Sequence, residues 1–187
     1  IRRQQASARY PGARGVTHQV ALLRGVNLGK RQVKMEALRA VVEAAGLSDV
    51  ATLLASGNLV LNAKLTGAKL EAKLERVILE GLELKTDVFV RDAVQLDAVI
   101  AANPFKVFAK SHPSFMVLAF MRAPASDDEL EAMKKTALTG EEWVQGEYCL
   151  YIKFPRGQGP SKLKTPKLAT SRNWNTIGKL ADIARST

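Results

Sequence analysis

The feature that most constrains the fold is an ordered alternation of strand-like and helix-like segments between residues 19 and 91. Short apolar runs and strict polar–apolar alternation predict four strands, at residues 19–23, 50–54, 59–62 and 86–91. Apolar residues at helical spacing predict two helices, at 35–45 and around 70–78. The resulting order, β-α-β-β-α-β, is that of a ferredoxin-like unit.

A second series follows a predicted linking helix at 92–102 and a Pro-containing connection at 103–113. It consists of a strongly apolar strand, a helix that opens on the capping box Ser126–Glu129, two short strands, a Pro/Gly/Lys-rich loop at 155–170 and a final helix from Trp174. This order, β-α-β-β-α, resembles the first series without a clear last strand. The sequence therefore predicts an α+β chain with two tandem ferredoxin-like units and a C-terminal helix.

We divide the chain accordingly into three parts. Residues 1–17 show no strand or helix period, and we interpret them as a disordered leader or a remnant of expression. Residues 18–102 form the first unit with its linking helix. Residues 103–187 form the second unit with the C-terminal helix.

Charge is concentrated at the two ends of the chain. The formal net charge is +10. Residues 1–17 contain four basic residues and no acid, and residues 153–187 contain eight basic residues and one acid, so the body between them is close to neutral. A uniformly basic surface would favour nucleic acid, whereas a localised basic patch fits a smaller anion about as well.

Several classes of protein are disfavoured by the residue inventory. No apolar run approaches the ~20 residues that span a bilayer, and no secretory pattern precedes residue 18, so we expect no membrane association. The single cysteine, Cys149, cannot form an internal disulfide, which favours a reducing cytoplasm, and its strand context predicts a buried, unreactive thiol. Two isolated histidines, His18 and His112, and the absence of ligand-spaced motifs predict neither a metal nor another cofactor.

Three short segments carry a family resemblance. They read Arg-Gly-Val-Asn-Leu-Gly at 24–29, Ser-Gly-Asn at 56–58 and Arg-Asn-Trp-Asn-Thr at 172–176. In this order and spacing the chain resembles the bacterial domain-of-unknown-function family 1697. The resemblance implies two ferredoxin-like units in one chain and no established activity.

The same segments supply the candidate site. The first is a Gly-bearing loop among basic residues, where backbone N–H groups could cradle an anion, although its glycines could simply serve a β-α turn. Ser-Gly-Asn equally suits a tight turn, and the last segment equally suits a helix cap. We predict that Arg24 and Arg172 converge on one oxyanion, with neutral donors around them. The predicted ligand-binding residues are Arg24, Asn27, Lys30, Lys34, Ser56, Asn58, Arg172, Asn173 and Asn175.

The sequence thus favours binding of a small anionic ligand, phosphorylated or carboxylated, in a basic cleft between the two units. A nucleic-acid-binding module is the alternative, disfavoured by an aromatic content of 6%, which leaves only Tyr151 and Phe154 near the basic segment to stack on bases. A third hypothesis is a protein-interaction module that uses a sheet edge. No catalytic residue can be assigned, and no signal indicates an oligomeric state.

Overall fold

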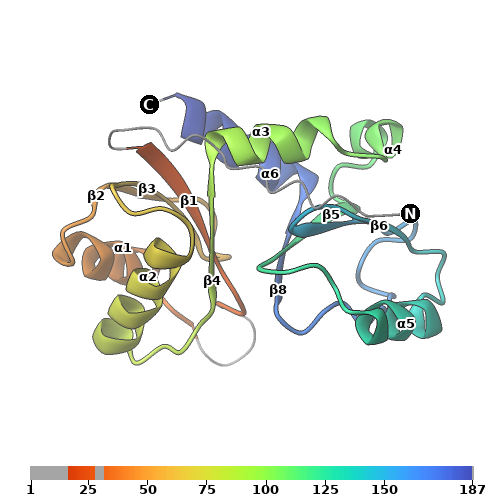
Figure 1. Ribbon diagram of the computed structural model, residues 1–187, viewed down its shortest axis with the longest axis horizontal. Coiled ribbons are helices and arrows are strands. Elements are labelled where there is room, and N and C mark those ends of the chain that lie inside the picture. The colour runs from red at the N-terminus through yellow and green to blue at the C-terminus, as the bar shows by residue number, and fades with distance from the viewer. Residues whose placement is uncertain (1–16, 28–31, 187) are drawn as a thin grey trace, which may run out of the picture.

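The computed structural model describes residues 17–27 and 32–186 (Figure 1). Its first half is a four-stranded antiparallel sheet in the spatial order β2-β3-β1-β4, with two helices on its outer face. The elements are β1 (Thr17–Leu23), α1 (Met35–Ala44), β2 (Ser48–Thr52), β3 (Asn58–Ala63), α2 (Gly67–Leu82) and β4 (Val88–Asp92). This is the ferredoxin-like order that the alternation of segments predicted.

The second half repeats the sheet but not all of its helices. Its strands follow the equivalent order β6-β7-β5-β8, and all neighbours are antiparallel. The elements are β5 (Met116–Met121), α5 (Asp127–Thr136), β6 (Glu142–Gln145), β7 (Cys149–Lys153), β8 (Ala169–Asn173) and α6 (Trp174–Arg185). The predicted fold class, α+β with two ferredoxin-like units and a C-terminal helix, is confirmed.

Two local interpretations of the second half were wrong. The last strand exists: residues 169–173 pair with β5 along its whole length, from Ala169 opposite Met121 to Asn173 opposite Val117. The final helix therefore follows this strand, and an irregular segment, residues 154–168, stands where the second helix of a complete unit would lie.

The segment that links the halves is more helical than predicted. α3 (Ala93–Ala101) begins at a capping box in which Asp92 and Gln95 exchange hydrogen bonds. The connection at 103–113 was predicted without a helix but contains α4 (Lys106–Ser111). The capping box of α5 between Ser126 and Glu129 is confirmed. Within the described ranges, no helix combines the length and hydropathy that a bilayer crossing requires.

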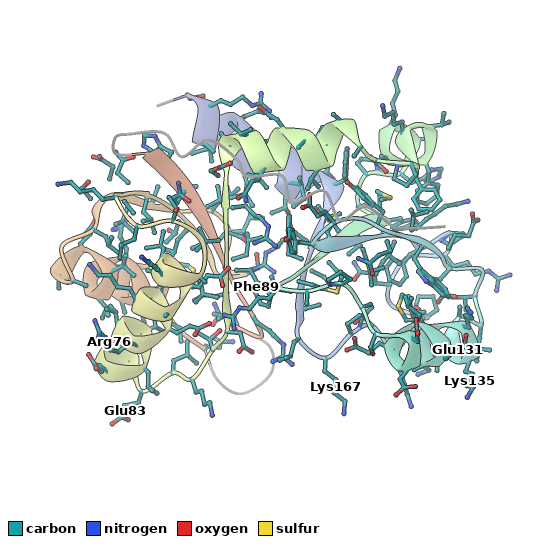
Figure 2. The ribbon with its side chains drawn as sticks, viewed as in Figure 1. Arg76, Glu83, Phe89, Glu131, Lys135 and Lys167 are labelled. Carbon is teal, nitrogen blue, oxygen red and sulfur yellow. The ribbon has the colours of Figure 1, made fainter. Side chains whose placement is uncertain are left out.

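Three apolar clusters form the core, and the middle one joins the halves. One lies between the first sheet and the helices α1 and α2, and another between the second sheet and α5. The middle cluster combines Val20, Leu22 and Phe89 of the first sheet with residues of β5, β7 and α6. Figure 1 shows α3 and α6 lying across the two units, and Phe89 lies near the centre of the molecule (Figure 2). Because both sheets bury a face in this cluster, neither half exposes that face to water.

The burial of the lone cysteine follows from strand alternation. Cys149 is 2% exposed and faces the middle cluster, whereas Leu150 and Ile152 face the cluster around α5. Burial raises the pKa of its thiol. The predicted burial is confirmed, and low reactivity stays a prediction.

Two arginines cross between the halves in a reciprocal arrangement. Arg91 of β4 donates to the carbonyl oxygens of Met121, at 2.8 Å, and Tyr148, at 3.4 Å, and lies over the Phe120 ring. Arg122, just after β5, reaches back to the carbonyl oxygen of Val88 at 2.9 Å and lies over the Phe89 ring. It also pairs with two carboxylates of α2, Glu71 and Glu75. Each half thus supplies a cation that binds backbone and an aromatic face of the other.

One buried carboxylate helps to hold the irregular segment 154–168 in place. Glu141, 6% exposed, accepts hydrogen bonds from the backbone N–H and hydroxyl of Thr139, at 2.9 and 2.6 Å, and from the hydroxyl of Ser161. Desolvation alone would raise the pKa of this carboxyl, but the hydrogen bonds to Ser161 and Thr139 outweigh it and lower the pKa to about 2. The ionised carboxylate therefore ties the segment to the start of β6.

We expect Glu141→Gln to destabilise the protein by about 1.5–3 kcal/mol at pH 7, because a neutral amide replaces an acceptor of charge-assisted hydrogen bonds. A lowered folded-state pKa contributes stability that is complete above the ordinary value of 4.5 and is lost as pH falls towards about 2. Urea unfolding of both proteins at several pH values measures this. The difference in free energy of unfolding between Glu141→Gln and the parent should become smaller below about pH 4.5.

The exposed Glu80→Gln, on α2, is the matched control and should behave like the unsubstituted protein. A gap between Glu141→Gln and the parent that stays constant from pH 7 to acid would contradict the assignment.

Candidate functional site

Arg172 of β8 reaches from the second unit into the first. The residue is 8% exposed. Its Nη2 donates to the carbonyl oxygens of Leu23 and Ser56, both at 2.9 Å, and of Gly57 at 3.3 Å. Its Nε donates to Oδ1 of Asn58. One guanidinium therefore contacts both the end of β1 and the turn that precedes β3.

The remaining donors of Arg172 stay within β8. Its Nη1 donates to Thr170 Oγ1 at 2.9 Å and to the carbonyl oxygen of Ser171 at 2.8 Å. The Thr170 hydroxyl in turn donates to the carbonyl oxygen of Leu23 at 3.1 Å. We call the set of Arg172, Leu23, Ser56, Gly57, Asn58 and Thr170 the arginine junction.

The arginine junction holds a buried charge among neutral acceptors. All the hydrogen bonds of Arg172 go to carbonyl, amide or hydroxyl oxygens, and no described carboxylate forms an ion pair with it. Desolvation by burial lowers the pKa of Arg172 to about 10, so the guanidinium stays charged at neutral pH. The fold thus keeps an uncompensated positive charge between its two units.

The Ser-Gly-Asn segment is shaped to receive this arginine. Asn58 is fully buried, and its Nδ2 donates to the carbonyl oxygen of Leu53 at 2.7 Å and to Ser56 Oγ at 2.9 Å. Gly57 has a φ of +73°, and a Cβ there would lie 3.0 Å from the Cβ of Leu23. The glycine is therefore required both by its backbone conformation and by the approach of β1.

Asn27 fastens the loop after β1 to the same turn. Its Nδ2 donates to the carbonyl oxygens of Ala55, at 2.6 Å, and Val33, at 3.1 Å, and its Oδ1 accepts from the Val33 N–H at 2.6 Å. Its own φ of 58° is left-handed, which asparagine tolerates better than most residues. The side chain thus bonds to backbone, and the ligand contact predicted for it stays a prediction.

Arg24, next to Leu23, has a different environment. Its Nη1 forms an ion pair with Asp87 Oδ2 at 2.7 Å, and its backbone N–H donates to the carbonyl oxygen of Asp87 at 2.9 Å. Its side chain is 39% exposed. The first and third segments therefore do come together, but Arg172 is turned inward and Arg24 outward.

A cleft opens beside Arg24, where the two units meet. It has a volume of about 470 Å³ and is lined by Arg24, Gly25, Lys85, Thr86 and Asp87 of the first unit and Ala169 and Thr170 of the second. We call it the junction cleft. Arg172 lies directly behind it, because the Thr170 hydroxyl accepts one of its hydrogen bonds.

The other predicted ligand residues are placed as follows. Asn173 caps α6, accepting from the backbone N–H and the hydroxyl of Thr176, both at 3.0 Å. Asn175 is exposed in the first turn of α6, and Lys34 is exposed just before α1 without a side-chain cap. Arg172 was predicted at a helix start and instead lies in β8. Lys30 lies outside the described residues.

The sequence analysis missed part of the lining of the junction cleft. It also considered two aromatic residues for base stacking that the structure buries. Lys85, Thr86 and Asp87 form a polar run just before β4, which was the available signal for a wall of the cleft. Tyr151 and Phe154, the two side chains considered for base stacking, are only 3% and 5% exposed and belong to the core. Neither offers a face to a nucleic acid in this fold.

A family model described as "Protein of unknown function (DUF1697)" matches residues 16–151. The chain belongs to this family. The resemblance seen in the short segments is thereby confirmed. The match includes the first two segments of the DUF1697 resemblance and ends before Arg172, so the contact between them and β8 is a feature that only the structure brings out.

A solved structure supports the same fold. The conserved bacterial protein SP0830 from Streptococcus pneumoniae is similar over 91% of this chain and 99% of its own, with a TM-score of 0.72 and 22% sequence identity. At that identity the likeness concerns the fold alone. No curated protein gives a significant match.

The contacts of the arginine junction should contribute to the free energy of unfolding of the protein. We expect Arg172→Lys to lower the free energy of unfolding by about 2–4 kcal/mol, because three ammonium protons cannot serve the six acceptors of the planar guanidinium. Urea unfolding followed by circular dichroism measures the change. Arg39→Lys, on the exposed face of α1, is the matched control. A loss below about 0.5 kcal/mol, as for an ordinary surface change, would show that the junction is dispensable.

Proposed function

We propose that the protein binds a small anionic metabolite, phosphorylated or carboxylated, in the junction cleft. The observation that carries this proposal is a cleft walled by both units in which two cations, Arg24 and Lys85, face one carboxylate, Asp87. Ligand sites occur preferentially at interfaces between domains, and a volume of about 470 Å³ lies within the usual range of ~300–1,000 Å³.

The donors of the cleft are suited to an oxyanion. Among the described residues, the Arg24 side chain forms one hydrogen bond, from Nη1 to Asp87, which orients the guanidinium and leaves its other N–H groups for a ligand. Lys85 is exposed and adds a mobile ammonium group with three donors. Arg24 would bind an oxyanion edge in a planar fork, while Lys85 would supply a point charge.

Arg172 would attract the anionic ligand electrostatically, without touching it. Its Nε, Nη1 and Nη2 all donate to protein oxygens already. We therefore assign Arg172 no direct contact with the ligand, unlike the grip by two arginines that the sequence predicted. Its charge is buried, has no ion-pair partner among the described residues and lies one hydrogen bond behind Thr170. Charges interact more strongly away from water, so an anion in the cleft would be attracted from behind as well as from the rim.

A neighbouring hollow favours a ligand with more than one anionic group. It has a volume of about 560 Å³, shares Arg24, Lys85, Thr86 and Asp87 with the junction cleft, and adds Arg76 and Glu75 of α2. Arg24 thus stands between two adjoining spaces. A pyrophosphate or a dicarboxylate could place one group in each.

Isothermal titration of the full chain with inorganic phosphate, pyrophosphate and citrate, at constant ionic strength, tests the proposal. We expect pyrophosphate or citrate to bind more tightly than phosphate, and Lys85→Ala to raise the Kd about fivefold or more, the effect of losing roughly 1 kcal/mol of interaction. The matched control is Lys135→Ala, on the exposed side of α5 and far from the cleft (Figure 2).

Two outcomes would overturn the proposal. One is saturable binding that Lys85→Ala and Lys135→Ala weaken equally, or not at all. The other is binding of a short single-stranded oligonucleotide at concentrations where none of the three anions binds, with the steep loss on adding salt that marks contacts to a phosphate backbone.

A further inference from the structure

A second cavity lies between the linking helix and the hairpin of the second unit. Its volume is about 310 Å³. One wall is α3 and the residues after it, including Ala98, Val99 and Pro104, and the other is the turn between β6 and β7, with Val144, Tyr148 and Tyr151. None of the residues of the junction cleft lines it. The cavity is therefore a separate space between the units.

Most of this cavity is apolar, and its shape is fixed. The Tyr151 hydroxyl donates to the carbonyl oxygen of Val99 at 2.8 Å, which joins the two walls at one side. At Gly146 a Cβ would come within 2.7 Å of Cys149 Sγ and 3.0 Å of a Tyr151 ring carbon, so the hairpin lies directly against these side chains. A cavity of this kind suits a compact apolar or aromatic body.

Among the described residues, Arg91 is the cation that lines the cavity. The Arg91 side chain is 11% exposed. Its Nη groups donate to the carbonyl oxygens of Val90, Met121 and Tyr148, and its nearest carboxylate, on Glu71, is 3.9 Å from Nη1. No hydrogen bond of its Nε–H group is found among the described residues. Desolvation, the largest effect on this group, lowers the pKa of Arg91 but leaves it charged at neutral pH.

The carboxylate among the described lining residues belongs to the hairpin. Glu147 also lines the cavity, but it is exposed, so water screens it more than it screens Arg91. An anionic group in the cavity would therefore be attracted mainly by Arg91. A carboxylate there would add an acceptor for this guanidinium, whose nearest described carboxylate is 3.9 Å away.

From these observations we infer that the cavity between α3 and the β6–β7 hairpin binds a small monocarboxylic acid with an aromatic or branched apolar body. The carboxylate accepts from Arg91, and the apolar body lies between Ala98 and Tyr148. This site differs from the junction cleft in chemistry, because it has one cation and mainly apolar walls.

The test uses benzoate and phenylacetate as probes and benzyl alcohol as their neutral counterpart, each titrated into the full chain and followed by NMR. We expect saturable binding of at least one acid, with benzyl alcohol bound about fivefold or more weakly. Ala98→Leu should raise the Kd of the acid about tenfold or more, because the larger side chain fills the cavity. The matched control, Ala101→Leu, changes an exposed alanine of the same helix that does not line the cavity and should bind like the parent.

The lone cysteine locates the probe independently. Cys149 lines the cavity, so a bound acid should slow the modification of its thiol by a disulfide reagent. Lys85→Ala should leave both readouts unchanged, which separates this inference from the proposed function. The inference is overturned if neither acid binds, if Ala98→Leu and Ala101→Leu bind alike, or if the acid and the alcohol bind equally well.

Discussion

The structure depends on one buried guanidinium, that of Arg172, which forms no ion pair with any described carboxylate. Arg172 carries its charge into the space between the two units and satisfies it with six neutral oxygens from β1, the turn before β3 and β8. Breaking these bonds would leave a desolvated charge and several buried acceptors unpaired, which is far more costly than losing a surface contact. The contacts therefore fix β8 of the second sheet against the end of β1 and the turn before β3 of the first.

Other contacts between the two units also hold them in one relative position. The middle apolar cluster draws side chains from both sheets and from α6, and Arg91 and Arg122 cross it in opposite directions. A ferredoxin-like unit of this size buries a modest core by itself, so sharing a core adds substantially to what each unit can bury. The two cavities that we assign to ligands both lie where the units meet, and their walls are set by the same contacts.

Sequence reasoning recovered the first unit well because its apolar periodicity is strong and Gly46 marks the end of α1. It missed β8 because Ala-Thr-Ser-Arg-Asn has no apolar alternation: its two buried side chains are those of Thr170 and Arg172. Only pairing with β5 makes it a strand. That the side-chain amides of Asn27 and Asn58 bond to backbone could not be predicted, because a sequence pattern does not show the partner of an amide. The partners of Arg172 in the first unit are more than a hundred residues away, beyond the reach of any local pattern.

Differential scanning calorimetry tests most directly the central claim that the arginine junction and the shared core make one cooperative body of the two units. We predict a single transition in which the calorimetric and van't Hoff enthalpies agree. Two resolved transitions, or a van't Hoff enthalpy well below the calorimetric one, would show that the units unfold independently and would contradict the account.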